Sequence, residues 1–302
     1  MKRLLIVIPV LVFLAAGIMA AMLVKIPEQQ GEIVVTTYPL EFLARRIGGD
    51  AITVMNMTAD GASPHTFEPT PQDVRTAYAA DLFIYSGSGV DPFAEGLAEE
   101  LVADGVRVIA ITGETPLADH LLQDADDNPD PHFWLDPRLM IEAAEILTLH
   151  MQTVWPDEQQ TFHDNLSELK ADLQELDTEL ENGLSSCTEH TIIVSHDAFS
   201  YFTERYGLTL YAIAGISPEQ EVSPQWLAEL TEIIREKQVR YIFTETLISP
   251  RLAETLAREA GVGTLILNPS DGLTAAERQA GTDYPAVMRG NLENLSLALA
   301  CK

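Results

Sequence analysis

After residue 30, short apolar runs alternate with longer amphipathic stretches in both halves of the chain. The runs are rich in Val, Ile, Tyr and Thr, and they predict β-strands at residues 32–38, 51–57, 81–87, 106–112, 190–196, 208–214, 239–245 and 263–269. Proline-initiated helices are expected at residues 91–103, 137–154, 223–237, 249–260 and 284–299. Strands separated by helix-length segments favour parallel pairing. The pattern predicts an α/β fold of two similar lobes, each with a mainly parallel four-stranded sheet.

One long helix is predicted between the two halves, at residues 156–184. Its apolar positions from Phe162 to Leu184 recur every three or four residues, and charged side chains occupy its other faces. We expect this helix to pack along both lobes, with a coiled-coil seam as the alternative. The predicted organisation is therefore a signal or membrane anchor at 1–30, an N-terminal α/β lobe at 31–155, the linking helix at 156–184 and a C-terminal α/β lobe at 185–302.

The N-terminal segment has the pattern of an export signal. Basic residues Lys2 and Arg3 precede an uncharged, mostly apolar run from Leu4 to Val24. The run approaches the length that spans a bilayer, so both an uncleaved membrane anchor and a cleaved signal peptide fit. Both interpretations place the rest of the chain outside the cytoplasm, in a periplasm or at the outer face of the cell membrane.

The composition is strongly acidic, with 46 Asp and Glu against 18 Lys and Arg and a net charge of −28. This charge repels phosphate backbones, so it argues against nucleic acid and favours a cationic ligand. The acidic run at residues 119–130 could collect cations loosely, although such runs are more often solvated surface loops. The two cysteines are too few for a cysteine-rich zinc domain.

Three histidines follow predicted strands. His65 lies in the proline-rich loop GASPHTFEPTP, His132 lies in DPHFWLDP, and His196 ends the strand at 190–196. Ligands of open α/β sheets bind beyond the carboxyl ends of the strands. Because all three histidines occupy such positions in halves that should face each other, they are candidate metal ligands.

Two acids follow later strands and extend this candidate site. Glu245 follows the predicted strand at 239–245, and Asp271 follows the one at 263–269. Three neutral imidazoles with one carboxylate suit Zn²⁺ better than the oxygen-preferring Mn²⁺. Glu245, Asp136 and Asp197 are candidate partners for the second ring nitrogens of the histidines, and Asp136 and Asp197 fit helix caps equally well. Since neutral imidazoles are needed, metal affinity should fall below about pH 6.5. A zinc hydrolase with an open fourth position is the alternative.

The motifs together resemble a known family. VVTTYPLEFLARRIGGD, GASPHTFEPTPQD, DPHFWLDP, IIVSHDAFSYFTERYGL, AGISPEQEVSP, YIFTETLISPRLAETLARE and LNPSDGLT carry the resemblance, which spans residues 32–302. The chain is similar to the zinc/manganese substrate-binding proteins of ABC transporters, the cluster A-I or ZnuA-like family. The resemblance implies a monomeric protein, not an enzyme, that delivers Zn²⁺ to an ABC import permease. Selectivity for Mn²⁺ or Fe²⁺ in the same transporter type is the alternative.

The resemblance also assigns the ligands. It implies His65 and His132 from the first lobe and His196 from the second, and a histidine in SHDAF is the zinc type. For the fourth ligand, Asp271 is preferred to Asn268 or water, because a carboxylate neutralises metal charge and an amide does not.

Relatives of this subtype often carry cysteines at the positions of Cys187 and Cys301. The resemblance therefore implies a disulfide between these two residues, with two free thiols as the alternative. A disulfide is compatible with an oxidising compartment outside the cytoplasm.

Overall fold

The computed structural model describes residues 31–123 and 127–302. The predicted signal or anchor at 1–30 lies outside the described residues, as does the middle of the acidic run, at 124–126. Among the described helices, none combines the length and the apolar character that crossing a membrane requires. Residues 32–302 form one unit, within which all the packing below occurs.

The first half of the chain forms a four-stranded sheet in the order β2-β1-β3-β4. Its strands are β1 (Gly31–Val35), β2 (Ile52–Asn56), β3 (Leu82–Tyr85) and β4 (Arg107–Ala110). Strand β1 pairs in parallel with β3, and β3 pairs in parallel with β4, as the sequence predicts.

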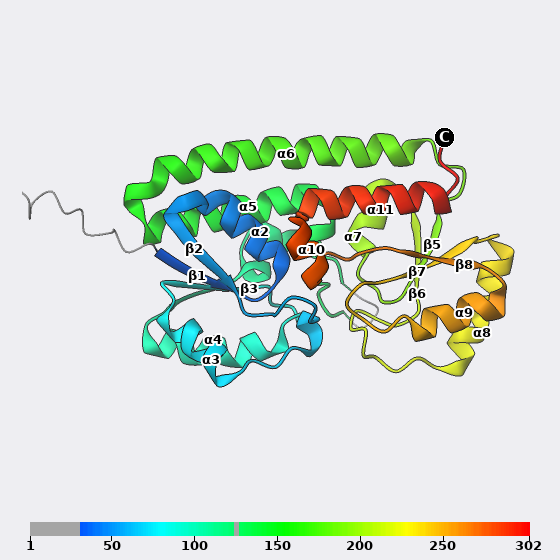
Figure 1. Cartoon of the computed structure of the whole chain (residues 1–302), viewed down its shortest axis with the longest axis horizontal. Helices are drawn as coiled ribbons and strands as arrows, with labels where there is room; N and C mark the ends of the chain where they lie inside the picture. The colour runs from blue at the N-terminus through cyan, green and yellow to red at the C-terminus, as the bar shows by residue number, and fades with distance from the viewer. Residues whose placement is uncertain (1–30, 124–126) are drawn as a thin grey trace, which may run out of the picture. The chain divides into compact units, whose positions relative to one another are not determined.

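Both faces of this sheet are covered by helices (Figure 1). The helices are α2 (Tyr38–Gly48), α3 (Pro71–Ala79), α4 (Pro92–Asp104) and α5 (Pro137–Val154). Ile33 and Val35 pack in the core that includes α2 and α5, whereas Val34 packs with Phe83 against α3 and α4. Consecutive strand residues point to opposite faces, so a strand buried on both faces needs an unbroken apolar run.

The second half contains two parallel strand pairs rather than the predicted single four-stranded sheet. The pairs are β5 (Thr191–Val194) with β6 (Thr209–Ala212), and β7 (Tyr241–Thr244) with β8 (Gly263–Ile266). Hydrogen bonds that involve side chains connect the residues after β5 to β7 and to the residue that follows it. Ser195 Oγ donates to the Phe243 carbonyl at 3.1 Å, and the His196 backbone N–H donates to Glu245 Oε1 at 3.2 Å. These side-chain bonds join the two pairs and place two candidate site residues beside each other.

Helices also pack on both sides of these strand pairs. They are α7 (Ser200–Tyr206), α8 (Pro224–Glu236), α9 (Arg251–Ala260), α10 (Ala275–Ala280) and α11 (Tyr284–Ala298). Leu230 of α8 and Leu256 of α9 share an apolar cluster with Ile193 and Ile242, while Met288 of α11 packs in the larger core.

The predicted linking helix consists of a 3-10 turn at Pro156–Glu158 followed by α6 (Gln159–Ser185). Its apolar stripe is buried, at Phe162, Leu169, Leu173, Leu176, Leu180 and Leu184. Figure 1 shows α6 running beside α5 of the first half and α11 of the second, and both helices pack against it. The stripe is therefore covered by helices of this same chain, and the coiled-coil alternative is not needed to explain it.

The sequence analysis did not predict four of the described helices, α2, α3, α7 and α10. Two of them begin with a capping box that the sequence does contain. Thr70 and Asp73 form one at α3, and Thr274 and Glu277 form the other at α10. Short length, with α10 spanning six residues, gave too little periodicity for a pattern-based prediction.

Cys187 and Cys301 form a disulfide in the structure. Cys187 follows α6, and Cys301 follows α11. The bond therefore fastens together the ends of the two long helices that lie over the second half.

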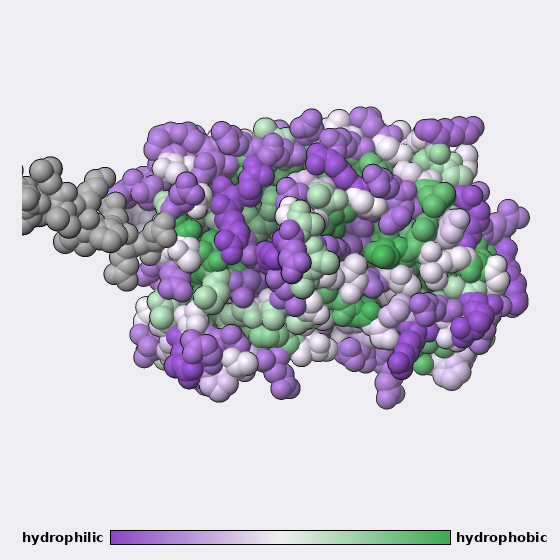
Figure 2. Space-filling view, in the orientation of Figure 1, coloured by the Kyte–Doolittle hydropathy of each residue, from purple (hydrophilic) through white to green (hydrophobic). Residues whose placement is uncertain are grey.

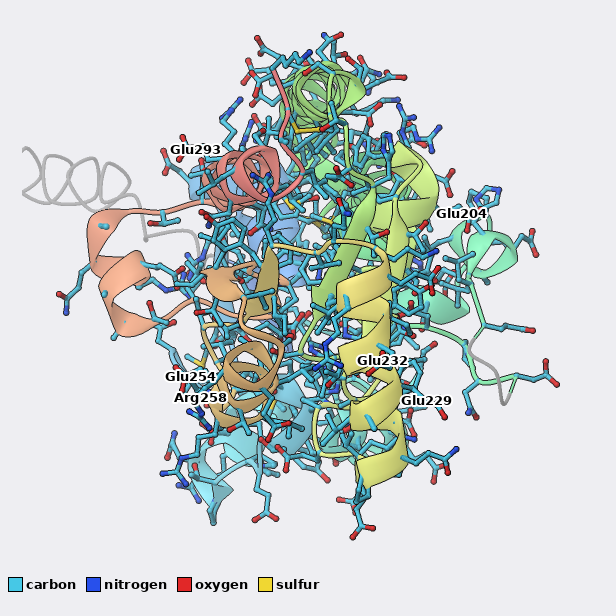
Figure 3. The ribbon with its side chains drawn as sticks, turned by 90° about the vertical axis from the view of Figure 1, so that its right-hand side faces the viewer. Glu204, Glu229, Glu232, Glu254, Arg258 and Glu293 are labelled. Carbon is cyan, nitrogen blue, oxygen red and sulfur yellow. A yellow bond between two sulfur atoms is a disulfide. The ribbon has the colours of Figure 1, made fainter. Side chains whose placement is uncertain are left out.

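Many of the acidic side chains lie at the surface. Figure 2 shows hydrophilic side chains over most of one face, with small apolar areas between them. Figure 3 labels exposed acids at the end formed by the second half, on α7, α8, α9 and α11: Glu204, Glu229, Glu232, Glu254 and Glu293. Such a surface attracts cations over distances of about a Debye length.

Candidate metal site

Four of the predicted site residues come together in the structure: His65, His132, His196 and Asp271. One donor atom from each lies within 4.8 Å of the others. We call these four residues the donor cluster. Two members come from each half of the chain, and all four side chains are almost fully buried.

The backbone around each histidine explains where its ring lies. His65 is held in the 3-10 turn Pro64–Thr66, which follows β2. His132 precedes the 3-10 turn Phe133–Leu135. His196 lies two residues beyond the end of β5, so its position depends on the strand. Two rigid turns and one strand end therefore set the three rings.

The donor atoms face a common point, and two of them have no hydrogen-bond partner there. His65 Nε2 lies 3.4 Å from His132 Nε2 and 3.9 Å from Asp271 Oδ2. His196 Nε2 and Asp271 Oδ1 are buried with no hydrogen-bond partner. Unpaired buried polar atoms are costly, so this arrangement fits a cation that would bind all four residues.

Carboxylates hold the other nitrogen of two of the rings. His132 Nδ1 lies 2.8 Å from Asp130 Oδ1, which also accepts the His132 backbone N–H at 2.9 Å. His196 Nδ1 lies 2.9 Å from Glu245 Oε1. These contacts occupy Nδ1 and leave Nε2 of each ring directed at the cluster, which is the arrangement of metal-binding histidines.

The three predicted carboxylate partners lie in different places. Glu245 lies beside His196, whereas Asp136 lies at the start of α5. Asp136 accepts the Arg138 backbone N–H at 2.8 Å and caps α5, because it lies at the position where the helix has an unpaired donor. Asp197 accepts a hydrogen bond from Ser200 Oγ at the start of α7.

Asp130 is the orienting residue that sequence analysis missed. It lies two residues before His132, which lets one carboxylate oxygen reach both the backbone N–H and Nδ1 of that residue. The signal in the sequence is an acid two residues before the histidine, in the motif DPH. The Asp130 carbonyl also accepts the Tyr201 hydroxyl at 2.7 Å, so α7 of the second half holds the same segment.

Asp271 and Asn268, the two candidates for the fourth ligand, have different roles in the structure. The Asn268 side chain accepts the Ser270 backbone N–H at 2.8 Å and donates to Glu277 Oε1 at 3.1 Å. It is therefore used in shaping the turn, in which Ser270 takes a φ of 63°. This turn directs Asp271 into the donor cluster.

The two halves of the donor cluster differ in protonation. Burial and the neighbouring histidines lower the pKa of His65 to about 2 and that of His132 well below its usual value. Burial acts to lower the pKa of His196 as well, but the charge and hydrogen bond of Glu245, with Asp271 and Asp197, raise it to about 9. Burial raises the pKa of Asp271 to about 7, although His196 acts against this. Glu245, Asp271 and Asp197 therefore favour the protonated form of His196, whereas burial favours the neutral forms of His65 and His132.

A family model described as the zinc-uptake complex component A, periplasmic, matches residues 33–298. The chain belongs to this family. The match covers both halves and all four members of the donor cluster, so the family's shared fold includes the elements that position this site.

Curated relatives and a solved structure agree with this membership. The zinc-binding lipoprotein AdcA of Streptococcus pneumoniae strain R6 is 34% identical over 273 residues, which are 87% of this chain and 54% of AdcA. The chain thus spans about half the length of that relative. The high-affinity zinc uptake system protein ZnuA of Bacillus subtilis is 32% identical over 284 residues, covering 89% of this chain and 88% of that protein.

The structural likeness is close over the whole described fold. The Zn(II)-bound ZnuA-like domain of Streptococcus pneumoniae AdcA superposes with a TM-score of 0.76 and 34% identity, covering 89% of this chain and 99% of the domain. This zinc-uptake family fold accounts for the two α/β halves and the long helix that packs along them.

The acidic run contributes one residue to the site. Of its described part, 119–123 and 127–130, Asp130 reaches the donor cluster through His132. His120 Nδ1 instead lies 2.8 Å from Glu142 Oε2 of α5. The run's proposed cation-collecting role therefore stays a prediction.

Proposed function

We propose that this chain is an extracytoplasmic Zn²⁺-binding protein that captures the metal and delivers it to an ABC import permease. The observation that carries the proposal is the donor cluster itself, with three imidazoles and one carboxylate buried within 4.8 Å of one another. Three nitrogens and one oxygen suit the tetrahedral coordination of Zn²⁺. The zinc-binding names of AdcA and ZnuA support the same assignment.

In this proposal His65, His132, His196 and Asp271 are the ligands, and the metal links the two halves of the chain. Each half supplies two donors, so separating the halves would break the coordination sphere. Asp130 and Glu245 fix the rings of His132 and His196 and supply negative charge that offsets the bound cation. Release to a permease would then require movement of one half against the other.

The zinc-hydrolase alternative is less well supported. A hydrolase needs an open coordination position and a nearby general base. Asp271 would fill the fourth position, and Glu245 is committed to the His196 ring and backbone N–H. The protein is therefore proposed to bind and transfer zinc without catalysis.

The remaining features of the proposal concern the setting of the protein. We assign residues 1–30 as a cleaved signal or a membrane anchor, 31–155 and 185–302 as lobes, and 156–184 as the linking helix of a monomer. The Cys187–Cys301 disulfide supports an oxidising compartment outside the cytoplasm.

The test is a competitive titration of metal-free protein with Zn²⁺ and Mn²⁺, on wild type, His196→Ala and His163→Ala. His163 is exposed on α6, so its variant controls for the loss of any imidazole. We expect one tight Zn²⁺ site that prevails over Mn²⁺, is lost in His196→Ala and persists in His163→Ala. Preference for Mn²⁺ would instead favour the alternative selectivity, and an unaffected His196→Ala variant would refute the site.

A further inference from the structure

The segment that carries Asp271 is attached to the first half of the chain by contacts outside the donor cluster. The Tyr38 backbone N–H, at the start of α2, donates to the Asp271 carbonyl at 3.2 Å. The Gly61 backbone N–H donates to the Leu273 carbonyl at 2.8 Å. Gly61 opens the loop that leads to His65, so the chain segments of two donors touch directly.

Arg278 of α10 strengthens this attachment with charge. Its guanidinium pairs with Glu41 through two bonds, Nη1 to Oε1 at 2.9 Å and Nη2 to Oε2 at 2.8 Å. Its Nε donates to Asp60 Oδ1 at 3.0 Å. We call Arg278 with Glu41 and Asp60 the Arg278 clamp. Two-bond pairing of a guanidinium with a carboxylate is both strong and directional.

The clamp joins both sides of the donor cluster at a distance from the metal. Glu41 lies in α2, and its side chain is only 3% exposed. Asp60 immediately precedes Gly61, at the base of the His65 loop. On the other side, Arg278 lies seven residues after Asp271, in the helix that Thr274 caps. One side chain therefore connects the base of the His65 loop to the segment of the fourth donor.

We infer that Arg278 is a positioning residue that sets how long the bound metal stays in the site. This inference rests on the proposed zinc-binding function. Movement of the Asp271 segment away from the His65 loop would break its bonds to Tyr38 and Gly61, and the clamp opposes that movement. Glu41 is buried and Arg278 is partly exposed, and loss of a hydrogen-bonded charge pair of this kind acts mainly on dissociation. The clamp should therefore slow metal release and leave metal capture nearly unchanged.

The local contacts indicate that the clamp can be removed without unfolding the protein. Without Arg278, Glu41 keeps its ion pair with Arg45 Nε at 2.9 Å and its hydrogen bond from Asn56 Nδ2 at 3.2 Å. No buried carboxylate is then left without a partner. Arg289 offers a matched control, because it pairs with Glu179 at 2.6 Å and joins α11 to α6 away from the Asp271 segment.

The experiment measures zinc dissociation from the full chain after mixing with excess EDTA, in wild type, Arg278→Gln, Arg278→Lys and Arg289→Gln. Trp134 serves as the fluorescent reporter, because its ring centroid lies 5.3 Å from that of His132. We expect Arg278→Gln to dissociate about tenfold faster with an association rate within about twofold of wild type. Arg278→Lys should recover only part of the loss, because an ammonium cannot reproduce the two-bond pairing. Arg289→Gln should dissociate at the wild-type rate.

Asp60→Asn supplies a second test that leaves the Arg278–Glu41 pair in place, and it decides the matter if Arg278→Gln fails to fold. It should accelerate dissociation by about threefold, as expected for a single exposed charge pair. A dissociation rate for Arg278→Gln within twofold of wild type, or equal acceleration in Arg289→Gln, would overturn the role of Arg278 alone. A wild-type protein that binds no zinc would overturn the proposed function and the clamp's role with it.

Discussion

The two halves of the donor cluster use the same kind of side chain, but the pKa values of their imidazoles shift in opposite directions. His65 and His132 are buried next to other imidazoles, and the pKa of each lies below its usual value, although His132 also contacts the Asp130 carboxylate. His196 is equally buried but faces Glu245 and Asp271, and its pKa rises to about 9. Burial is common to all three rings, and around His196 the charges of Glu245, Asp271 and Asp197 outweigh it.

This difference shows that the two halves are suited to a cation in different ways. The first half offers two neutral nitrogens that are ready to bind. In the second half the carboxylates favour a protonated His196, and the positive charge lowers the cost of burying those negative charges. A metal ion replaces this proton, so the cation-binding character of the second half exists in both states.

The largest expected effect is on the free energy of unfolding, in a variant that loses the Cys187–Cys301 disulfide and keeps the donor residues. A double Cys187→Ser, Cys301→Ser variant should lose about 4–5 kcal/mol of unfolding free energy, because the disulfide spans a sequence separation of 114. Zinc affinity should change little, since Cys187 precedes β5 and His196 follows it. Urea unfolding and zinc titration of the same sample measure the two quantities. A large loss of zinc affinity in the same variant would contradict the prediction that the disulfide stabilises the fold without affecting the metal site.

The next effect tests the acid donor against an acid cap. Asp271→Ala removes one of the four proposed zinc ligands. If each ligand contributes a quarter of the binding free energy, the zinc affinity should fall by about a hundred- to a thousandfold. Asp136→Ala should keep its affinity within threefold and lose about 1 kcal/mol of stability, because Asp136 caps α5. Titration with a competing chelator measures both. Full affinity in Asp271→Ala would reopen the fourth position and revive the hydrolase alternative.

A smaller effect separates the two orienting carboxylates. Glu245→Gln and Asp130→Asn should each lower zinc affinity by about 10- to 100-fold, the usual loss when a ligand's hydrogen-bond partner changes. Proton release on zinc binding at pH 8 should disappear in Glu245→Gln and remain in Asp130→Asn, because Glu245 is what raises the pKa of His196. Calorimetry in buffers of different ionisation enthalpy reports the released protons. Equal release in both variants would remove the contrast between the halves.

The most gradual effect is the pH dependence of the wild type. Binding needs deprotonated His196 and Asp271, whose pKa values are about 9 and about 7. Affinity should therefore fall about tenfold per unit from pH 9 to 7 and more steeply below pH 7. His65, with a pKa of about 2, should not compete in this range. A flat affinity between pH 9 and 7 would show that His196 holds no proton.

This window differs from the one expected for an ordinary histidine, near pH 6.5. The sequence supplied the residue type, and the carboxylates that surround it in the fold moved the transition. Glu245 is 49 residues away from His196 in the chain, so no local pattern could give the direction of that shift.

The sequence alone determined the α/β class, the parallel strands of the first half, the long helix and the three histidines of the donor cluster. These features follow from local periodicity and from residue type near strand ends, and both are properties of short segments. Motif likeness added the disulfide pair.

Only the tertiary structure decided which acids serve the site and how its second half is held. Asp130 rather than Asp136 orients His132, Asn268 shapes a turn while Asp271 enters the cluster, and Arg278 reaches Glu41 across 237 positions of sequence. All these acids look alike in a sequence, because a carboxylate has the same chemistry in a cap, a turn or a metal site. Its role depends on which donors the folded chain brings within about 3 Å, and that distance is set by packing between elements far apart in the sequence.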